Sequence, residues 1–312
     1  MDHDELIQKL YASLGESCVT DPGVAHVEVH GNRVLGVHLV PGFEVEAEEK
    51  EDGIDARIVV REGVKIDKPV RICFGMLPES GVQRIAMDVR LEDDARIAIL
   101  ASCTFPNAVD VLHTMDAELR LGKRAAYAYL ERHVHGDRGG VRVVPKAKVH
   151  LDEAARFRTD FELIKGRAGR IDIDYEAECG PRSVLEMSAR IGGRGDDAVV
   201  IDERAHLAGE GARGALTTVI ALRDRARAEA RNTLKASAPY ARGHVDCKEI
   251  VQDEADALAV PIVQVLHPKA HVTHEAAIGS VDSKQLETLM SRGLEEDRAT
   301  DLIIEGLLGA DV

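Results

Sequence analysis

The chain has 312 residues, of which 45% are hydrophobic, so it is long enough for one large domain or two ordinary ones. Lysine and arginine number 40 against 55 aspartate and glutamate residues, giving a formal net charge of −15. Because phosphate binding needs concentrated positive charge, this balance argues against nucleic acid as a partner. Aromatic residues make up 3% and tryptophan is absent from the sequence, so the core must be built from Val, Ile, Leu and Ala.

The five cysteines, at positions 18, 73, 103, 179 and 247, are odd in number and form no CxxC pair. This arrangement is neither a disulfide framework nor a zinc-finger spacing. No apolar run approaches the roughly 20 residues needed to span a bilayer, and the N-terminus lacks the hydrophobic region of a signal peptide. The sequence therefore predicts a cytoplasmic protein that does not engage a membrane.

Residues 1–24 are predicted to form an N-terminal helical segment. In DELIQKLYASL (4–14) the apolar residues recur at helical spacing, and Gly15 is a natural stop. Such a short amphipathic helix must pack on the body that follows, and its simplest role is a cap.

Residues 25–281 are predicted to form a β-body, because the hydrophobic period changes to two. Runs such as HVEVHG, QRIAMDVRLE and ALTTVIALRD alternate in polarity and are separated by Gly, Pro and Asp. More than about ten short strands without long intervening helices exclude a doubly wound α/β fold, whose parallel strands need crossovers. A large sandwich or barrel and a β-solenoid remain. The Gly and Asp corners favour the solenoid, and Asp52-Gly53 is a candidate hairpin turn.

Residues 282–312 are predicted to form a C-terminal helical segment. Asp282 with Gln285 three residues on resembles a capping box, and Gly293 can end that helix in the left-handed conformation. A second helix is expected at about 295–308. Its apolar stripe comprises Leu302, Ile303 and Leu307. This tail either seals the open end of the β-body or docks a partner.

Three local motifs carry less information. GEGARG (209–214) matches a dinucleotide fingerprint, but the following residues predict a strand instead of the required helix, so a Gly-rich corner is the better interpretation. ERHVHG places Glu131, His133 and His135 on one strand face, where a solvated face is more common than a metal site. HVTHE does not satisfy the HExxH pattern of zinc hydrolases.

The organising stretch runs from Asn232 to Leu308. It contains a small-residue run ending in GHVDCKEIV, the block HVTHEAAIG, and a helical tail MSRGL…GLL. These three blocks, in this order, resemble the C-terminal region of the SufB/SufD family of iron–sulfur cluster assembly scaffolds. The resemblance covers about a quarter of the chain, and the upstream β-body shares only the general pattern of short alternating strands. It implies a right-handed parallel β-helix core with flanking helical segments.

The resemblance also implies a site made of Cys247, His274 and Glu275. One thiolate, one imidazole and one carboxylate suit a cluster that must be held and later released. The interval between Cys247 and His274 is about one turn of a solenoid, so neighbouring strands could carry them. The alternative is a buried structural cysteine beside a core histidine.

The implied cargo is a transient iron–sulfur cluster, of the 4Fe–4S type. The implied partners are a SufC-like ATPase at the C-terminal helices, a second copy or a SufB/SufD paralogue, a sulfur donor and apo-protein recipients. With no P-loop in the sequence, the chain is expected to bind no nucleotide and to perform no catalysis itself. The chain is short for either subunit.

An upstream cysteine of the family receives sulfur. Cys103 and Cys179 are the candidates here, and a buried inert thiol is the alternative for both. A β-solenoid carbohydrate-active enzyme or binding protein is the rival function. It would need paired acids and aromatic sugar platforms, and the sequence has only five Tyr, five Phe and no Trp.

Overall fold

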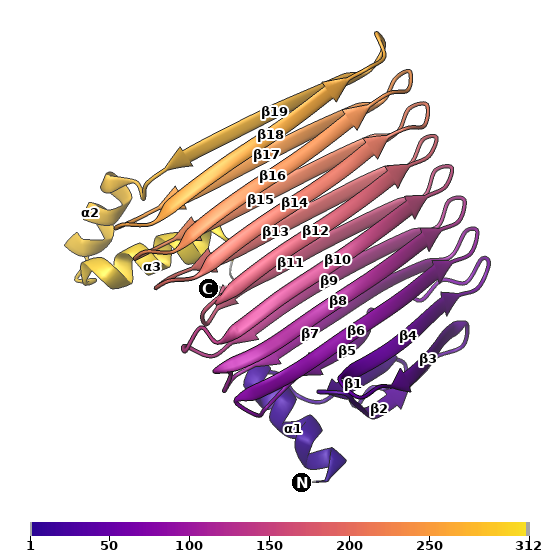
Figure 1. Ribbon diagram of the computed structural model, residues 1–312, viewed down its shortest axis with the longest axis horizontal. Helices are drawn as coiled ribbons and strands as arrows, with labels where there is room; N and C mark the ends of the chain where they lie inside the picture. Colours follow the sequence, from indigo (N-terminus) through magenta and orange to yellow (C-terminus); the bar gives the residue numbers. More distant parts are fainter. Residues whose placement is uncertain (1, 310–312) are drawn as a thin grey trace.

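A computed structural model describes residues 2–309 of the chain. The chain forms a β-solenoid of about eight coils, in which successive strands alternate between two facing sheets (Figure 1). In spatial order the 10-stranded sheet contains β19 (His271–Gly279), β17 (Arg242–Val251), β15 (Arg213–Leu222), β13 (Val184–Gly193), β11 (Arg156–Lys165), β9 (Ala126–His135), β7 (Arg96–Phe105), β5 (Val70–Gly75), β1 (His26–His30) and β2 (Arg33–His38). The 9-stranded sheet contains β18 (Asp256–Val265), β16 (Arg227–Ala236), β14 (Ala198–Leu207), β12 (Arg170–Cys179), β10 (Val141–Leu151), β8 (Asp110–Leu121), β6 (Ser80–Leu91), β4 (Gly53–Val60) and β3 (Phe43–Glu49). The predicted solenoid is confirmed.

Each coil returns the chain to the same sheet, beside the strand of the coil before it. Arg170 of β12 thus pairs with Ala198 of β14, and Val111 of β8 pairs with Val141 of β10. The pairing is parallel, so the side chains with one parity along every strand fill the space between the sheets and form one continuous core. The exceptions are the antiparallel pairs β1–β2 and β3–β4. The second is a hairpin close to the predicted Asp52-Gly53 turn, but its connection lies at residues 50–52, and Gly53 is already the first residue of β4.

The coils turn at equivalent corners in the left-handed backbone conformation. One set of corners lies where the chain passes from the 9-stranded to the 10-stranded sheet. Between β4 and β17, one residue at each of these corners has φ between 57° and 69°, namely Gly63, Asp94, Arg124, Ala154, Arg182, Gly211 and Tyr240. Gly211 belongs to the GEGARG motif, and β15 begins two residues later. The expected Gly-rich corner is therefore present, followed by a strand instead of a helix.

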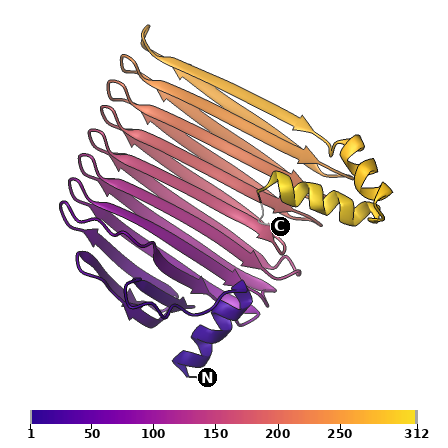
Figure 2. The same ribbon diagram turned by 180° about the vertical axis from the view of Figure 1, so that it is seen from behind.

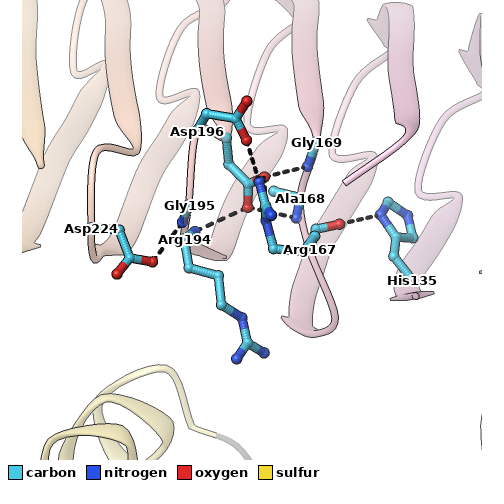
Figure 3. Close-up of polar contacts among 9 residues, drawn as sticks. His135, Arg167, Ala168, Gly169, Arg194, Gly195, Asp196 and Asp224 are labelled. Carbon is cyan, nitrogen blue, oxygen red and sulfur yellow. Dashed lines mark hydrogen bonds and ion pairs between the residues drawn. The ribbon is translucent and has the colours of Figure 1, made fainter. Parts of the chain in front are cut away.

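The second set of corners lies where the chain passes from the 10-stranded to the 9-stranded sheet. There the buried carboxylate of Asp197 joins the corners of two adjacent coils (Figure 3). Asp197 is 1% exposed, and its carboxylate accepts four hydrogen bonds of 2.9–3.0 Å, from Nε of Arg167 and from the backbone N–H groups of Ala168, Gly169 and Arg194. The carbonyl of Arg167 in turn accepts a hydrogen bond of 2.9 Å from Nδ1 of His135. The corner thus holds an interior histidine in one orientation.

Helix α1 (His3–Leu14) packs on the outer face of the 10-stranded sheet. Asp2 caps its N-terminus by accepting from the N–H of Glu5, and Gly15 ends it with φ 72°. Leu10 and Tyr11 are buried in a small cluster that includes Cys73 of β5. The predicted helix and its stop are confirmed.

Helices α2 (Ser283–Ser291) and α3 (Glu296–Leu307) form the C-terminal tail. The side chain of Asp282 accepts from the N–H of Gln285 at 2.9 Å, and Gly293 has φ 94°, as expected for a cap and a stop. The tail packs on outward-facing residues of the 10-stranded sheet, on the same side as α1 (Figure 2). It therefore does not seal the open end of the core.

The predicted apolar stripe of α3 is partly wrong. Ile303 is buried as expected, but Leu307 is 49% exposed, whereas Ile304 and Leu308 pack against Ala221 of β15. The pattern alone could not tell which side of the helix meets the sheet. Within residues 2–309, no helix is long and apolar enough to cross a membrane.

Candidate functional site

Strand β17 places Cys247 inside the solenoid. Val245, Cys247 and Glu249 alternate with exposed or half-buried residues, so their side chains point between the sheets. Cys247 is 0% exposed and Glu249 is 1% exposed. The predicted cysteine is thus an interior residue, flanked on the same strand face by an acid.

An interior polar network surrounds this thiol. Sγ of Cys247 lies 3.5 Å from Oδ1 of Asn232 on β16, which also accepts a weak hydrogen bond from the hydroxyl of Thr218 at 3.4 Å. Nδ2 of Asn232 donates to Oε2 of Glu203 on β14 at 2.8 Å. Because Asn232 contacts three partners from three strands, it is the centre of the network.

Burial sets the protonation states of the network. It raises the pKa of Cys247 to about 12, with smaller contributions from the charges of Glu249, Asp246 and Glu203. Burial also raises the pKa of Glu203 to about 8 and that of Glu249 to about 7. Both carboxyl oxygens of Glu249 are buried, and neither has a hydrogen-bond partner among residues 2–309. In this conformation Cys247 is a neutral thiol, and it must lose a proton before it can bind a metal.

His274 lies on the edge strand β19, on the same face as Cys247. In the parallel pairing of β17 with β19, Val245 is beside His274 and Cys247 is beside Ala276. His274 therefore faces the interior side, displaced by two residues from Cys247, but it is exposed because β19 belongs to the final coil. The structure brings these two predicted residues onto one face of neighbouring strands.

Glu275 has the opposite orientation. It is beside Asp246 on the outer face of the sheet, where its charge contributes to the raised pKa of Lys248 after the larger effects of Asp246. Adjacent residues of a strand point to opposite faces, so one strand cannot direct both His274 and Glu275 toward Cys247. In the described conformation Glu275 is separate from the other two.

The final coil is open along one side. β18 and β19 are the terminal strands of their sheets, so each presents one unpaired edge within the described residues. Large apolar side chains are exposed on this coil, namely Leu258, Val265, Leu266 and Ile278. Cys247 lies one strand in from this edge.

Sequence reasoning missed the residues around the thiol. Glu203, Asn232 and Glu249 were not assigned to the site, although all three are buried. The signal available for Glu249 was the alternation of side chains along a strand, since a residue two positions after Cys247 lies on the same strand face. The partners from β14 and β16 needed the register of the coils.

The interpretation of ERHVHG as a solvated face was wrong. Glu131, His133 and His135 are 1–5% exposed and point into the core. Of the candidate upstream cysteines, Cys103 is buried beside Glu131, and burial raises its pKa well above the ordinary value. Burial also raises the pKa of Cys179, to about 12.

The comparisons with known proteins define the class of this solenoid. The family profile "SUF system FeS cluster assembly, SufBD core domain" matches residues 79–307. The chain is 37% identical over 281 residues to an iron–sulfur cluster assembly SufBD family protein of Methanocaldococcus jannaschii, covering 90% of this chain and 89% of that protein. It is 35% identical over 286 residues to a protein of the same description from Pyrococcus horikoshii, covering 92% and 87%.

A more distant match links the chain to a longer relative. The iron–sulfur cluster assembly protein SufB of Bacillus subtilis is 24% identical over 265 residues, which cover 80% of this chain and 54% of that protein. The chain belongs to the SufBD family of iron–sulfur cluster assembly proteins. The resemblance seen in the last quarter of the sequence therefore extends over most of the chain.

Proposed function

We propose that this protein is a scaffold on which a nascent iron–sulfur cluster is built where two chains meet. The cluster is cargo, held by the thiolate of Cys247 and the imidazole of His274 until it passes to an apo-protein. The observation that carries this proposal is the common face of Cys247 and His274 at the open end of the solenoid. Glu275 becomes a third ligand when the edge strand β19 rearranges.

A second copy of the chain, or a SufB/SufD paralogue, is the proposed occupant of the open end. The unpaired edge of β19 can add a strand from a partner, and the exposed apolar residues of the final coil would be covered. A two-fold pairing of identical chains brings the same patch from each side, and hence two copies of Cys247 and His274. Family membership favours this function over a carbohydrate enzyme.

The neutral, buried Cys247 requires an opening step, and the tail can transmit one. Arg223, at the corner after β15, pairs with Asp297 and Asp301 of α3 at 2.8 Å. The hydrophobic cluster beneath the tail includes Ile250 of β17, three residues from the cysteine. We propose that α2 and α3 dock a SufC-like ATPase in the cytoplasm. Nucleotide-driven closure of that ATPase moves β17 and exposes the thiol of Cys247.

The first test is anaerobic co-purification with the candidate ATPase, followed by iron and sulfide analysis and visible spectroscopy. Cys247→Ser should abolish cluster build-up, His274→Ala should reduce it strongly, and Glu275→Ala should reduce it less. Cys73→Ser is the matched control, because Cys73 is also buried but packs in the cluster under α1, in an earlier coil. Equal iron and sulfide in wild type and Cys247→Ser would exclude this cysteine as a ligand.

The second test separates docking from packing in the tail. Leu307→Asp changes an exposed residue and should abolish ATPase binding without unfolding the solenoid. Ile304→Asp changes a residue packed on the sheet and should detach α3, which circular dichroism and proteolysis detect. Unchanged affinity of the Leu307→Asp protein for the ATPase would show that this surface of α3 is not the docking site.

A further inference from the structure

A second interior cluster lies in the middle of the solenoid, with further coils on both sides. In the pairing of β7 with β9, Cys103 is directly beside His133, and Glu131 is two residues before His133 on the same inward face. Oε1 of Glu131 is 3.9 Å from Sγ of Cys103 and 2.7 Å from Nε2 of His133. One sulfur, one oxygen and one nitrogen atom thus lie within 4.8 Å of one another in the core.

The hydrogen bonds fix the tautomers of two histidines. Nδ1 of His135 contacts the carbonyl oxygen of Arg167 at 2.9 Å, and because a carbonyl only accepts, this nitrogen carries the proton (Figure 3). In the neutral ring Nε2 of His135 then accepts, and its partner at 3.2 Å is Nδ1 of His133. Nδ1 of His133 therefore donates, which leaves Nε2 of His133 with a free lone pair.

That lone pair faces a carboxyl oxygen. Two acceptors 2.7 Å apart, Nε2 of His133 and Oε1 of Glu131, need either a proton or a cation between them. Oε2 of Glu131 is buried and has no hydrogen-bond partner in the part of the chain that the structure describes. On the facing strand β8, both ring nitrogens of His113 are also buried and lack a side-chain hydrogen-bond partner among the described residues. The ring centroids of His113 and His133 are 5.9 Å apart.

We propose that this cluster is a binding site for a single divalent transition-metal ion. Cys103, Glu131 and His133 are the ligands, and His113 from the other sheet completes a tetrahedral set. A mixed sulfur, nitrogen and oxygen set suits a borderline ion, Zn²⁺ or Fe²⁺. The chain from His133 through His135 to a backbone carbonyl is the arrangement that orients a metal-binding histidine.

Binding displaces protons and requires a small adjustment. The thiol proton of Cys103 and the proton shared by Glu131 and His133 leave as the ion enters, which leaves a thiolate, a carboxylate and a neutral imidazole. Ligand atoms about 2.0–2.2 Å from a tetrahedral ion lie roughly 3.3 Å apart, so the Glu131–His133 contact must widen by about half an ångström. The closed surroundings suit a resident ion that joins the two sheets, in contrast to cargo at the open end.

The experiment uses the full chain, purified anaerobically without chelators, and also the chain refolded with Zn²⁺, Fe²⁺ or Co²⁺ because the site is enclosed. Metal analysis should find one equivalent per chain, and the Zn²⁺ and Fe²⁺ arms identify the preferred ion. The Co²⁺ protein should show thiolate charge-transfer and tetrahedral d–d absorption. Cys103→Ser and His133→Gln should each lose the ion and these bands.

Two controls separate this site from the rest of the chain. Cys179→Ser and Cys247→Ser should each retain the equivalent of metal, and the second should do so while losing cluster build-up. Glu131→Gln, nearly isosteric, tests the site should Cys103→Ser fail to fold by circular dichroism. Absence of stoichiometric metal in both the purified and the refolded protein overturns the proposal, as does equal retention in Cys103→Ser or Glu131→Gln.

Discussion

Two buried cysteines of the 10-stranded sheet have different surroundings. Cys103 on β7 lies among histidines and a glutamate in the middle of the stack, with further coils on both sides. Cys247 on β17 lies beside the amide of Asn232, one strand from the open edge. The strand geometry is the same, so the two thiols differ in their neighbouring side chains and in their distance to the open edge.

The two clusters also solve the problem of buried polar groups differently. Asn232 has both a donor and an acceptor, so it satisfies Glu203 and the thiol of Cys247 with neutral hydrogen bonds. Around Cys103 the facing groups are mainly acceptors, and a proton or an ion must join them. Three tests examine this difference between the two clusters, and each has an outcome that would contradict it.

The largest expected effect is on stability at the C-terminal cluster. Asn232→Leu leaves the carboxyl of Glu203 and the thiol of Cys247 unpaired in the core, which should lower the free energy of unfolding by about 3 kcal/mol. Thr218→Val is the control, because it removes one long hydrogen bond of the same network and should cost less than about 1 kcal/mol. Chemical denaturation measures both, and equal losses would show that Asn232 is not the centre.

The pH dependence of stability tests the same network. Burial raises the pKa of Glu203 from the ordinary 4.5 to about 8, so between these values the folded state holds a proton that the unfolded state has released. The contribution is complete below about pH 4.5 and is lost as pH rises through about 8. Between pH 6.5 and 7.5 it lowers stability by about 1.4 kcal/mol per pH unit. Glu203→Gln should reduce this slope and leave the contributions of Glu249 and Glu131, whose pKa values burial also raises, to about 7. An unchanged slope would contradict the assignment.

The smallest effect concerns access to the two thiols. Both are fully buried, but the last coil can open without disturbing the others, whereas exposing Cys103 requires opening inside the stack. We expect a small alkylating reagent to modify Cys247 about tenfold faster or more under native conditions, as peptide mass spectrometry would measure. Faster modification of Cys103 would reverse the comparison.

The fold could be predicted because its signals are local. Period-two runs and polar corners indicate a solenoid without any knowledge of pairing, and the caps at Asp2, Asp282 and Gly293 are short-range features. The burial of the tail was harder. One-residue differences, such as exposed Leu307 beside buried Leu308, depend on where the helix meets the sheet.

The site could be predicted only in part, because the sequence motif does not determine the register in which neighbouring strands pair. The coil is longer than the interval between Cys247 and His274, so Cys247 is beside Ala276 and not beside His274, and parity turns Glu275 outward. In β9 the apolar residues Leu130 and Val134 face outward while Glu131 and His133 face inward, which is the reverse of the usual polarity pattern of a strand. Tyr127 and Tyr129, which share the parity of Glu131, were the sign that this face is buried.

The repeated left-handed corner makes the coil a unit of length. Because each coil turns at an equivalent residue, adding or deleting one whole coil preserves strand parity, whereas an insertion of a single residue in a strand reverses its faces. β7 and β17 are five strand steps apart in the sheet, so their cysteines are separated by roughly 24 Å at about 4.8 Å per step. The number of coils between the two clusters therefore sets the distance between them, and a change in that number would alter the distance without altering either cluster.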